Sequence, residues 1–244
     1  MLLAIDIGNT RIKCAVFNNS DLLEHFSFEH SKLENCINQI LLKHPQCKDV
    51  IVASVGNYAP MDFENLKTFI KWHFLTHQSN FPFQNKYATP ATLGIDRMVL
   101  SGGAVLMFPE TNRLVIDAGT CITFDFINSN DQYLGGAISP GIRMRYEALH
   151  HFTARLPLLD TKSPDSFIGD STAESMHAGV IYGVLNEIDG FIEQYKVTNE
   201  NIKVILTGGD SEFLAMRLKN TIFASPNFLL ESMNQIFQYQ TTND

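Results

Sequence analysis

Residues 2–17 read LLAIDIGNTRIKCAVF, and residues 113–126 read RLVIDAGTCITFDF. Each segment has an apolar, β-branched run that ends in an aspartate, a short turn containing glycine, and a second β-branched run. This order is typical of two strands joined by a tight turn. A unit that recurs in this way predicts two structurally similar lobes, which we place at residues 1–110 and 111–244.

Strand-like and helix-like segments alternate along the rest of the chain, which indicates an α/β protein. Val50–Val55 has the pattern of a strand buried on both faces, and Val204–Leu206 with Thr207-Gly208-Gly209 is its expected counterpart in the second lobe. We expect helices over about 32–43, preceded by the Ser31/Glu34 capping box, from Asp62, from Ile95, over 172–195 and from Asn227.

The expected helix over 172–195 has an apolar face that includes Val180, Val184 and Ile188. It follows an insertion around 140–172 that has no equivalent in the first lobe. The periodicity leaves two interpretations open, because such a face can cover a partner subunit or pack in the core of its own lobe.

Composition narrows the class of protein. The chain has 244 residues, 45% of them hydrophobic, with 18 Lys and Arg against 26 Asp and Glu and a net charge of −8. This length can bury a core without disulfides, and the absence of a basic run argues against nucleic acid or a membrane as partner. No apolar run is long enough to cross a bilayer, and Asp6 interrupts the N-terminal one, so we expect a cytoplasmic protein that binds a small molecule. The spacing of the four cysteines fits neither a metal motif nor a disulfide framework, and we expect buried thiols.

The two Asp-and-glycine turns carry the first chemical signal. Backbone N–H groups and a threonine hydroxyl in such a turn suit phosphate oxygens. A carboxylate beside them repels a polyphosphate unless a cation lies between, so Asp6 and Asp117 indicate a nucleotide bound with Mg²⁺ or another hard cation. The chain has neither GxxxxGK[ST] nor GxGxxG after a strand. His150, His151 and His177 lack partners at useful spacing, and we expect surface or hydrogen-bonded histidines rather than metal ligands.

Two lobes that each open on such a turn look like the actin, hexokinase and Hsp70 superfamily. Within it the chain resembles the type III pantothenate kinase family. The motifs that carry the resemblance follow in the order Asp6-Ile7-Gly8-Asn9-Thr10, Gly94-Ile95-Asp96-Arg97, Asp117-Ala118-Gly119-Thr120, Gly135-Gly136-Ala137-Ile138-Ser139-Pro140-Gly141, Ala154-Arg155-Leu156-Pro157, Thr172-Ala173-Glu174 and Thr207-Gly208-Gly209. The resemblance implies an α/β fold of two ribonuclease-H-like lobes with a nucleotide cleft between them.

The resemblance also implies an activity, the ATP-dependent phosphorylation of the primary hydroxyl of pantothenate, which is the first step of coenzyme A biosynthesis. It implies ATP with Mg²⁺, a monovalent cation (K⁺ or NH₄⁺), and a homodimer. Asp96 is similar to the family's proton acceptor, and Arg97 offers a planar cation for the carboxylate of pantothenate. The other implied residues are Tyr87, Gly94, Ile95 and Thr172 for the substrate, Asp6, Ile7, Gly8, Asn9, Thr10, Arg11, Ile12, Lys13 and Thr120 for ATP, and Asp117 for the monovalent cation.

Three alternatives stay open at this point. Another small-molecule kinase or a phosphatase of the same superfamily would share the turns, and a non-catalytic regulator would bind nucleotide without turnover. Lys13 can serve as a cation for phosphate or face solvent in an alternating strand.

Overall fold

The computed structural model describes residues 1–54 and 70–243. The chain divides into two compact units. The first contains residues 1–109, 131–133 and 227–244, and the second contains residues 110–130 and 134–226. No described helix combines the length and the apolar composition needed to cross a membrane.

The first unit is built on a sheet of five strands. They are β1 (Leu2–Ile7), β2 (Ile12–Asn18), β3 (Asp21–Phe28), β4 (Asp49–Ser54) and β5 (Lys71–Phe74), in the order β3-β2-β1-β4-β5. Because β1 is buried along its whole length, both of its faces must be covered. Leu3, Ile5 and Ile7 pack with helix α1 (Leu33–Lys43), and α6 (Phe228–Asn243) also packs against β1.

The second unit repeats this topology. Strands β7 (Asn112–Ala118), β8 (Cys121–Ile127), β9 (Gln132–Pro140), β10 (Ile202–Thr207) and β11 (Phe223–Ala224) lie in the order β9-β8-β7-β10-β11. In both sheets the first strand pairs antiparallel with the second and parallel with the fourth. The short β6 (Gln84–Asn85) pairs with Gln132 and Tyr133, the part of β9 that belongs to the first unit. The α/β class and the internal repeat are therefore confirmed.

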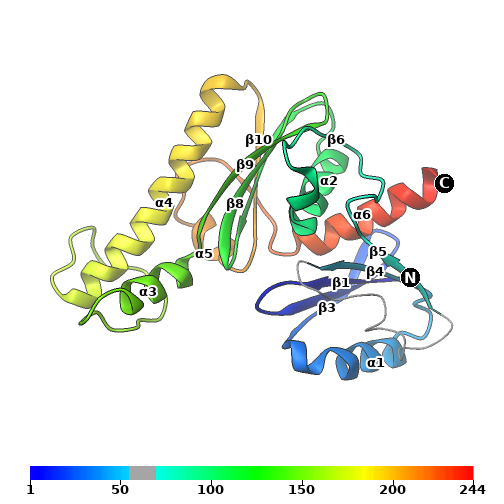
Figure 1. Cartoon of the computed structure of the whole chain (residues 1–244), viewed down its shortest axis with the longest axis horizontal. Coiled ribbons are helices and arrows are strands. Elements are labelled where there is room, and N and C mark those ends of the chain that lie inside the picture. Colours follow the sequence, from blue (N-terminus) through cyan, green and yellow to red (C-terminus); the bar gives the residue numbers. More distant parts are fainter. Residues whose placement is uncertain (55–69, 244) are drawn as a thin grey trace. The chain divides into compact units, whose positions relative to one another are not determined.

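The long helix of the second unit is α4 (Thr172–Thr198), which runs beside the sheet (Figure 1). Its stripe, including Val180, Val184 and Ile188, is buried in the core of its own unit with Leu114, Ile116 and the other sheet residues. Of the two interpretations of this face, the structure selects packing within the lobe. Two shorter helices, α3 (Ile142–His151) and α5 (Ser211–Ala215), complete the unit.

The start of α1 differs from expectation. The helix is confirmed, but the Ser31/Glu34 capping box is wrong, because Ser31 lies inside a 3₁₀ turn, His30–Lys32, and the N-cap residue is Lys32. That cap makes no side-chain hydrogen bond to the helix. The helix expected from Asp62 and the end of the strand at Val55 lie outside the described residues.

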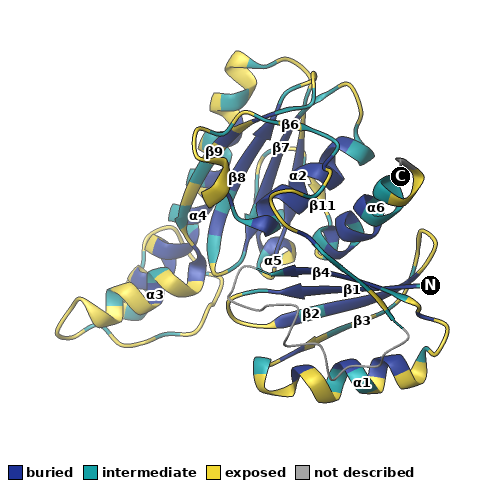
Figure 2. Cartoon of the chain, turned by 45° about the vertical axis from the view of Figure 1, so that its right-hand side comes forward, coloured by how far each residue is buried: buried dark blue, intermediate teal, exposed yellow. Residues whose placement is uncertain are grey.

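The C-terminal helix also differs from expectation. Residues 227–244 group with the first unit, although we expected them in the second lobe. The reason is the apolar face of α6, formed by Phe228, Leu230, Met233 and Ile236, which is buried (Figure 2). It packs against α2 (Ile95–Met107) as well as β1. The approach is close, since a Cβ built on Gly103 of α2 would lie 1.9 Å from the Ser232 Oγ of α6.

Candidate active site

The turn between β1 and β2 is the first phosphate-type turn. The Gly8 N–H donates to the Arg11 carbonyl at 3.2 Å and closes the turn, which leaves Asn9 and Thr10 exposed. Asp6 is buried at the end of β1, opposite Lys13 in the register. Ile7 and Ile12 are buried to 1% and 0% exposure, so their side chains belong to the core and only their backbone can serve a ligand.

The Arg11 side chain is hydrogen-bonded to the neighbouring strand β3. Its Nε donates to Ser27 Oγ at 2.7 Å, and its Nη2 donates to the Ser27 carbonyl at 2.9 Å. This guanidinium therefore ties the turn to β3, a contact that the sequence did not indicate. Lys13 is half-buried on β2, and both roles considered for it stay open.

The second turn, between β7 and β8, carries Asp117 and Thr120. Asp117 is half-buried and Thr120 is exposed. Two other segments of the same unit are hydrogen-bonded to this turn. The Gly141 N–H donates to the Thr120 carbonyl at 3.1 Å, and the Asp210 N–H donates to the Ala118 carbonyl at 3.0 Å.

Gly208 also approaches this turn closely. It adopts a φ of 97°, and a Cβ built on it would lie 2.4 Å from the Asp117 Oδ1. Only glycine fits there. Gly141, Gly208 and Asp210 are functional candidates that we had not assigned, although the glycines belong to motifs the sequence displays. Burial raises the pKa of Asp210 above its usual value.

The polar groups of the turn that carries Asp117 are oxygen donors. Carboxylate, hydroxyl and backbone carbonyl oxygens are hard ligands, which suit a hard cation rather than a soft transition metal. Within residues 1–54 and 70–243, no group of three His, Cys, Asp or Glu side chains could hold a metal ion. Two of the three histidines have hydrogen-bond partners within the second unit. His150 Nδ1 lies 2.8 Å from the Leu156 carbonyl oxygen, and His177 Nδ1 lies 2.8 Å from the Tyr146 Oη.

A third group of candidates lies at the start of α2. Gly94 is its N-cap residue, and Asp96 and Arg97 occupy its first turn. The Arg97 N–H donates to Asp96 Oδ1 at 2.8 Å. A Cβ on Gly94 would lie 2.3 Å from that same oxygen, so glycine is required for this carboxylate position. Burial raises the pKa of Asp96, and the neighbouring Arg97 N–H and guanidinium partly offset the increase.

Tyr87 joins Asp96 and Arg97 in space. The Arg97 guanidinium is buried and lies over the Tyr87 ring, 5.9 Å from its centroid. Tyr87 in turn meets Tyr133 edge-on at 6.0 Å, and its N–H donates to Asn85 Oδ1 at 2.9 Å. The structure thus brings together three of the predicted substrate residues, with Tyr133 as a support that sequence reasoning missed. Ile95 is buried in the same turn.

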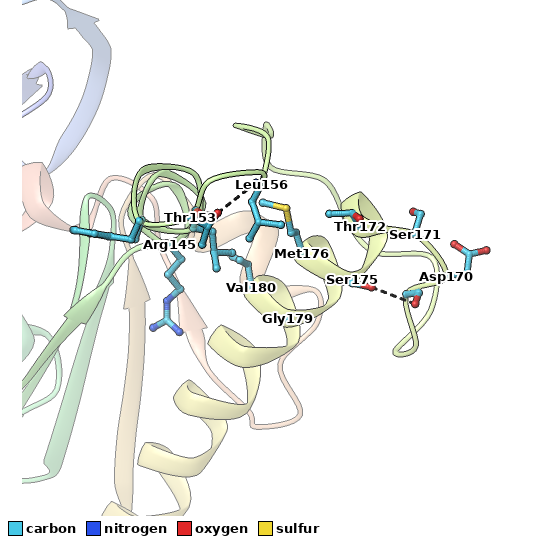
Figure 3. Close-up of a pocket in the computed structure, with 14 residues that line it drawn as sticks. Arg145, Thr153, Leu156, Asp170, Ser171, Thr172, Ser175, Met176, Gly179 and Val180 are labelled. Carbon is cyan, nitrogen blue, oxygen red and sulfur yellow. Dashed lines mark hydrogen bonds between the residues drawn. The ribbon is translucent and has the colours of Figure 1, made fainter.

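Thr172 lies in the second unit, at the first residue of α4. It is exposed and lines a cavity of about 1050 Å³ between α3 and the start of α4 (Figure 3). The Ser171 side chain caps the helix by accepting from the Glu174 N–H at 3.3 Å.

Comparison with known proteins decides the family. Residues 2–194 match the sequence profile described as type III pantothenate kinase. The type III pantothenate kinase of Flavobacterium johnsoniae is 60% identical over 244 residues, covering 100% of both chains. That of Flavobacterium psychrophilum is 54% identical over 240 residues, covering 98% of this chain and 100% of its own. The chain belongs to the type III pantothenate kinase family.

Solved structures support the fold of this family member. A Campylobacter jejuni protein assigned to the Baf family of transcriptional activators aligns with a TM-score of 0.64 at 24% identity, covering 98% of this chain and 99% of its own. The ROK hexokinase of Thermus thermophilus aligns with a TM-score of 0.53 at 11% identity, covering 96% and 97%. At these identities the likeness concerns the fold alone, which is the two-lobe fold of the sugar kinases.

Proposed function

We propose that this type III pantothenate kinase transfers the γ-phosphoryl group of ATP to the primary hydroxyl of pantothenate, the first step of coenzyme A biosynthesis, in the cytoplasm. The observation that carries the proposal is the joint placement of Asp96 and Arg97 in the first turn of α2. One side chain accepts a proton and its neighbour binds a carboxylate, and pantothenate offers both a hydroxyl and a carboxylate.

Arg97 anchors the substrate. Its guanidinium is buried and held against the Tyr87 ring, so it presents a planar fork with little conformational freedom. Such a fork binds a carboxylate through two parallel hydrogen bonds, and a buried cation favours an anionic ligand. The family resemblance assigns Gly94, Ile95 and Thr172 to the substrate as well.

Asp96 acts on the hydroxyl. As the hydroxyl oxygen forms its bond to the γ-phosphorus, the bond from phosphorus to the bridging oxygen of ADP breaks, and the hydroxyl proton passes to the Asp96 carboxylate. The raised pKa of Asp96 makes its carboxylate a stronger base than an exposed aspartate. The hydrogen bond from the Arg97 N–H holds one carboxylate oxygen and thereby orients the other.

The phosphates of ATP belong to the two turns. In this proposal Asp6 to Lys13 supply backbone N–H groups and the Thr10 hydroxyl, Thr120 adds a second hydroxyl, and Asp117 holds K⁺ or NH₄⁺. Bound Mg²⁺ and the monovalent cation supply positive charge for the phosphoryl oxygens during transfer. The chain's own residues fix where those charges lie.

A coupled assay of ADP release tests the activity. Turnover from ATP and Mg²⁺ should require pantothenate, and it should fall when K⁺ or NH₄⁺ is replaced by Na⁺. Turnover with other alcohols, acids or sugars but without pantothenate would favour another kinase of the superfamily. Nucleotide binding without turnover on any of these acceptors would favour the regulator.

Dimerisation is part of the proposal. Phe152, Phe167 and Ile168 are 81%, 71% and 80% exposed, and all three belong to the insertion of the second unit. Phe152 lines the same cavity as Thr172. Large apolar side chains exposed in one segment are typical of an interaction surface. We expect Phe167→Asp to shift the protein from dimer to monomer in sedimentation velocity. A variant that stays dimeric would remove this surface from the interface.

A further inference from the structure

The segment Ser139-Pro140-Gly141 ends β9 and leads into α3, and it lies directly on the second phosphate-type turn. The Gly141 N–H donates to the Thr120 carbonyl at 3.1 Å. A Cβ built on Gly141 would lie 2.2 Å from the Gly119 oxygen and 2.5 Å from the Thr120 oxygen. Because backbone packs on backbone without a flexible side chain between, a displacement of this segment must move the turn.

Two charged side chains hold the segment in place. Arg145 of α3 donates from Nε to the Pro140 carbonyl at 2.9 Å and from Nη2 to Glu187 Oε2 of α4 at 2.7 Å. The Ser139 hydroxyl donates to the other carboxylate oxygen of Glu187. The Glu187 carboxylate therefore accepts a hydrogen bond at each of its oxygens. One comes from Ser139 of the segment, and the other comes from Arg145, which is itself hydrogen-bonded to the segment.

The surroundings make this arrangement stronger than a surface ion pair. The side chains of Arg145 and Glu187 are only 21% and 25% exposed. Charge-assisted hydrogen bonds are stronger where water is largely excluded, whereas exposed pairs contribute little. Figure 3 shows the Arg145 side chain extending along α4, at the opposite end of the cavity from Thr172.

We propose that Arg145 and Glu187 are positioning residues for the turn Asp117–Thr120, and that they set its affinity for nucleotide and monovalent cation. The inference rests on the proposed function, which assigns that turn to ATP and to K⁺ or NH₄⁺. Arg145 holds the Pro140 carbonyl, and Glu187 holds both Arg145 and Ser139. Loosening either contact lets the segment leave Thr120, so the turn loses the backbone that supports it.

The same helix offers a matched control. Arg143 and Glu147, two positions before and two positions after Arg145 on α3, form an ion pair with an Nε to Oε1 distance of 2.8 Å. Their side chains are 46% and 56% exposed. Glu147→Gln removes one carboxylate charge, as Glu187→Gln does, but from α3, the helix that carries Arg145, and without touching the segment, so it should leave nucleotide binding unchanged.

The experiment measures binding by calorimetry, with the Mg²⁺ complex of a non-hydrolysable ATP analogue in KCl and in NaCl. Glu187→Gln and Arg145→Lys should each weaken analogue binding in KCl about tenfold or more, the effect expected when one charge-assisted hydrogen bond is lost. The lysine can still pair with Glu187 but cannot hold Glu187 and Pro140 together. Steady-state assays should show the KM for ATP and the K⁺ activation constant rising together, with the KM for pantothenate within about twofold of wild type.

Three results would overturn the proposal: wild-type binding in Arg145→Lys, wild-type binding in Glu187→Gln, or an equal loss in Glu147→Gln. Thermal unfolding of each variant shows that it is folded, and Ser139→Ala replaces Glu187→Gln as the second variant if the latter does not fold. Wild-type protein that fails to bind the analogue at all would contradict the proposed function instead. The experiment therefore distinguishes a failure of the positioning role from a failure of the proposed function.

Discussion

At the scale of single residues, burial raises the pKa of Asp96, the residue proposed to accept the proton. Its carboxylate is desolvated, and the Arg97 N–H compensates only in part. We expect Asp96→Asn to bind ATP and pantothenate while turnover falls about 10²- to 10⁴-fold, the range that a positioned base contributes. The check is kcat beside calorimetric binding of both substrates. Unchanged kcat would remove Asp96 from the mechanism.

The same residue predicts a pH dependence. Because the pKa of Asp96 is raised in the folded protein, its contribution to stability is greatest in acid and is lost as the pH rises through the raised pKa. An asparagine does not titrate, so the unfolding temperature of Asp96→Asn relative to wild type should increase from about pH 4 to about pH 8. Turnover by the wild type should fall over the same range as the pH is lowered. A difference in unfolding temperature that is constant across this range would contradict the assignment.

Replacing Arg97 tests substrate binding separately from phosphoryl transfer. Arg97→Lys keeps the charge but loses the planar fork and the guanidinium that lies over the Tyr87 ring. We expect the KM for pantothenate to rise about tenfold, the loss of one hydrogen bond to a charged group, with a smaller change in kcat. Steady-state kinetics with pantothenate varied at saturating ATP measures both. A fall in kcat without a change in KM would assign Arg97 to the transferred phosphoryl group instead.

At the scale of elements, the helix that carries the substrate motif, α2, packs so closely on α6 that there is no room for a Cβ at Gly103. A Cβ on Gly103 would meet Ser232 at its Oγ (1.9 Å), Cβ (2.4 Å) and Cα (2.9 Å), so backbone as well as side chain must move. We expect Gly103→Ala to destabilise the protein by about 1–3 kcal/mol, as overpacked cores do. Urea unfolding measures the change.

Gly190 of α4 provides the matched control. Nothing lies within 4 Å of a Cβ built there, and the position is an exposed helix interior. Alanine is the better helix former, so Gly190→Ala should stabilise the protein by about 0.5–1 kcal/mol. Equal effects at both glycines would show that helix propensity, and not packing on Ser232, decides the outcome.

The sequence predicts those helices, strands and turns that are encoded by a short run of neighbouring residues. Both Asp-and-glycine turns, the flanking strands, α2 and α4 follow from short patterns, and the family motifs place Asp96 and Arg97 correctly in one turn of α2. The sequence misses partners supplied from elsewhere in the chain. Ser27 for Arg11 and Tyr133 for Tyr87 come from distant strands, and no periodicity encodes those pairings.

At the scale of the whole molecule, the repeated strand order is the part of the fold that sequence reasoning reaches. Equal topology in β1–β5 and β7–β11 follows from one recurring pattern. The position of α6 does not follow, because an apolar stripe predicts a helix but not which sheet it covers. The nucleotide and cation assignments of Asp6, Thr120 and Asp117 stay predictions, and the assays described above test them.

The return of α6 to the first unit has a consequence for how the chain is made. The substrate motif at Gly94–Arg97 is synthesised before the second unit, but α6, the helix that packs on α2, is synthesised after it. Domains usually fold in the order of their synthesis. Here the second unit, which ends at residue 226, is synthesised in full before α6, so the packing of the first unit cannot be completed until α6 has been made. A nascent chain that has not yet reached α6 therefore lacks the helix that packs on α2, which carries the substrate motif.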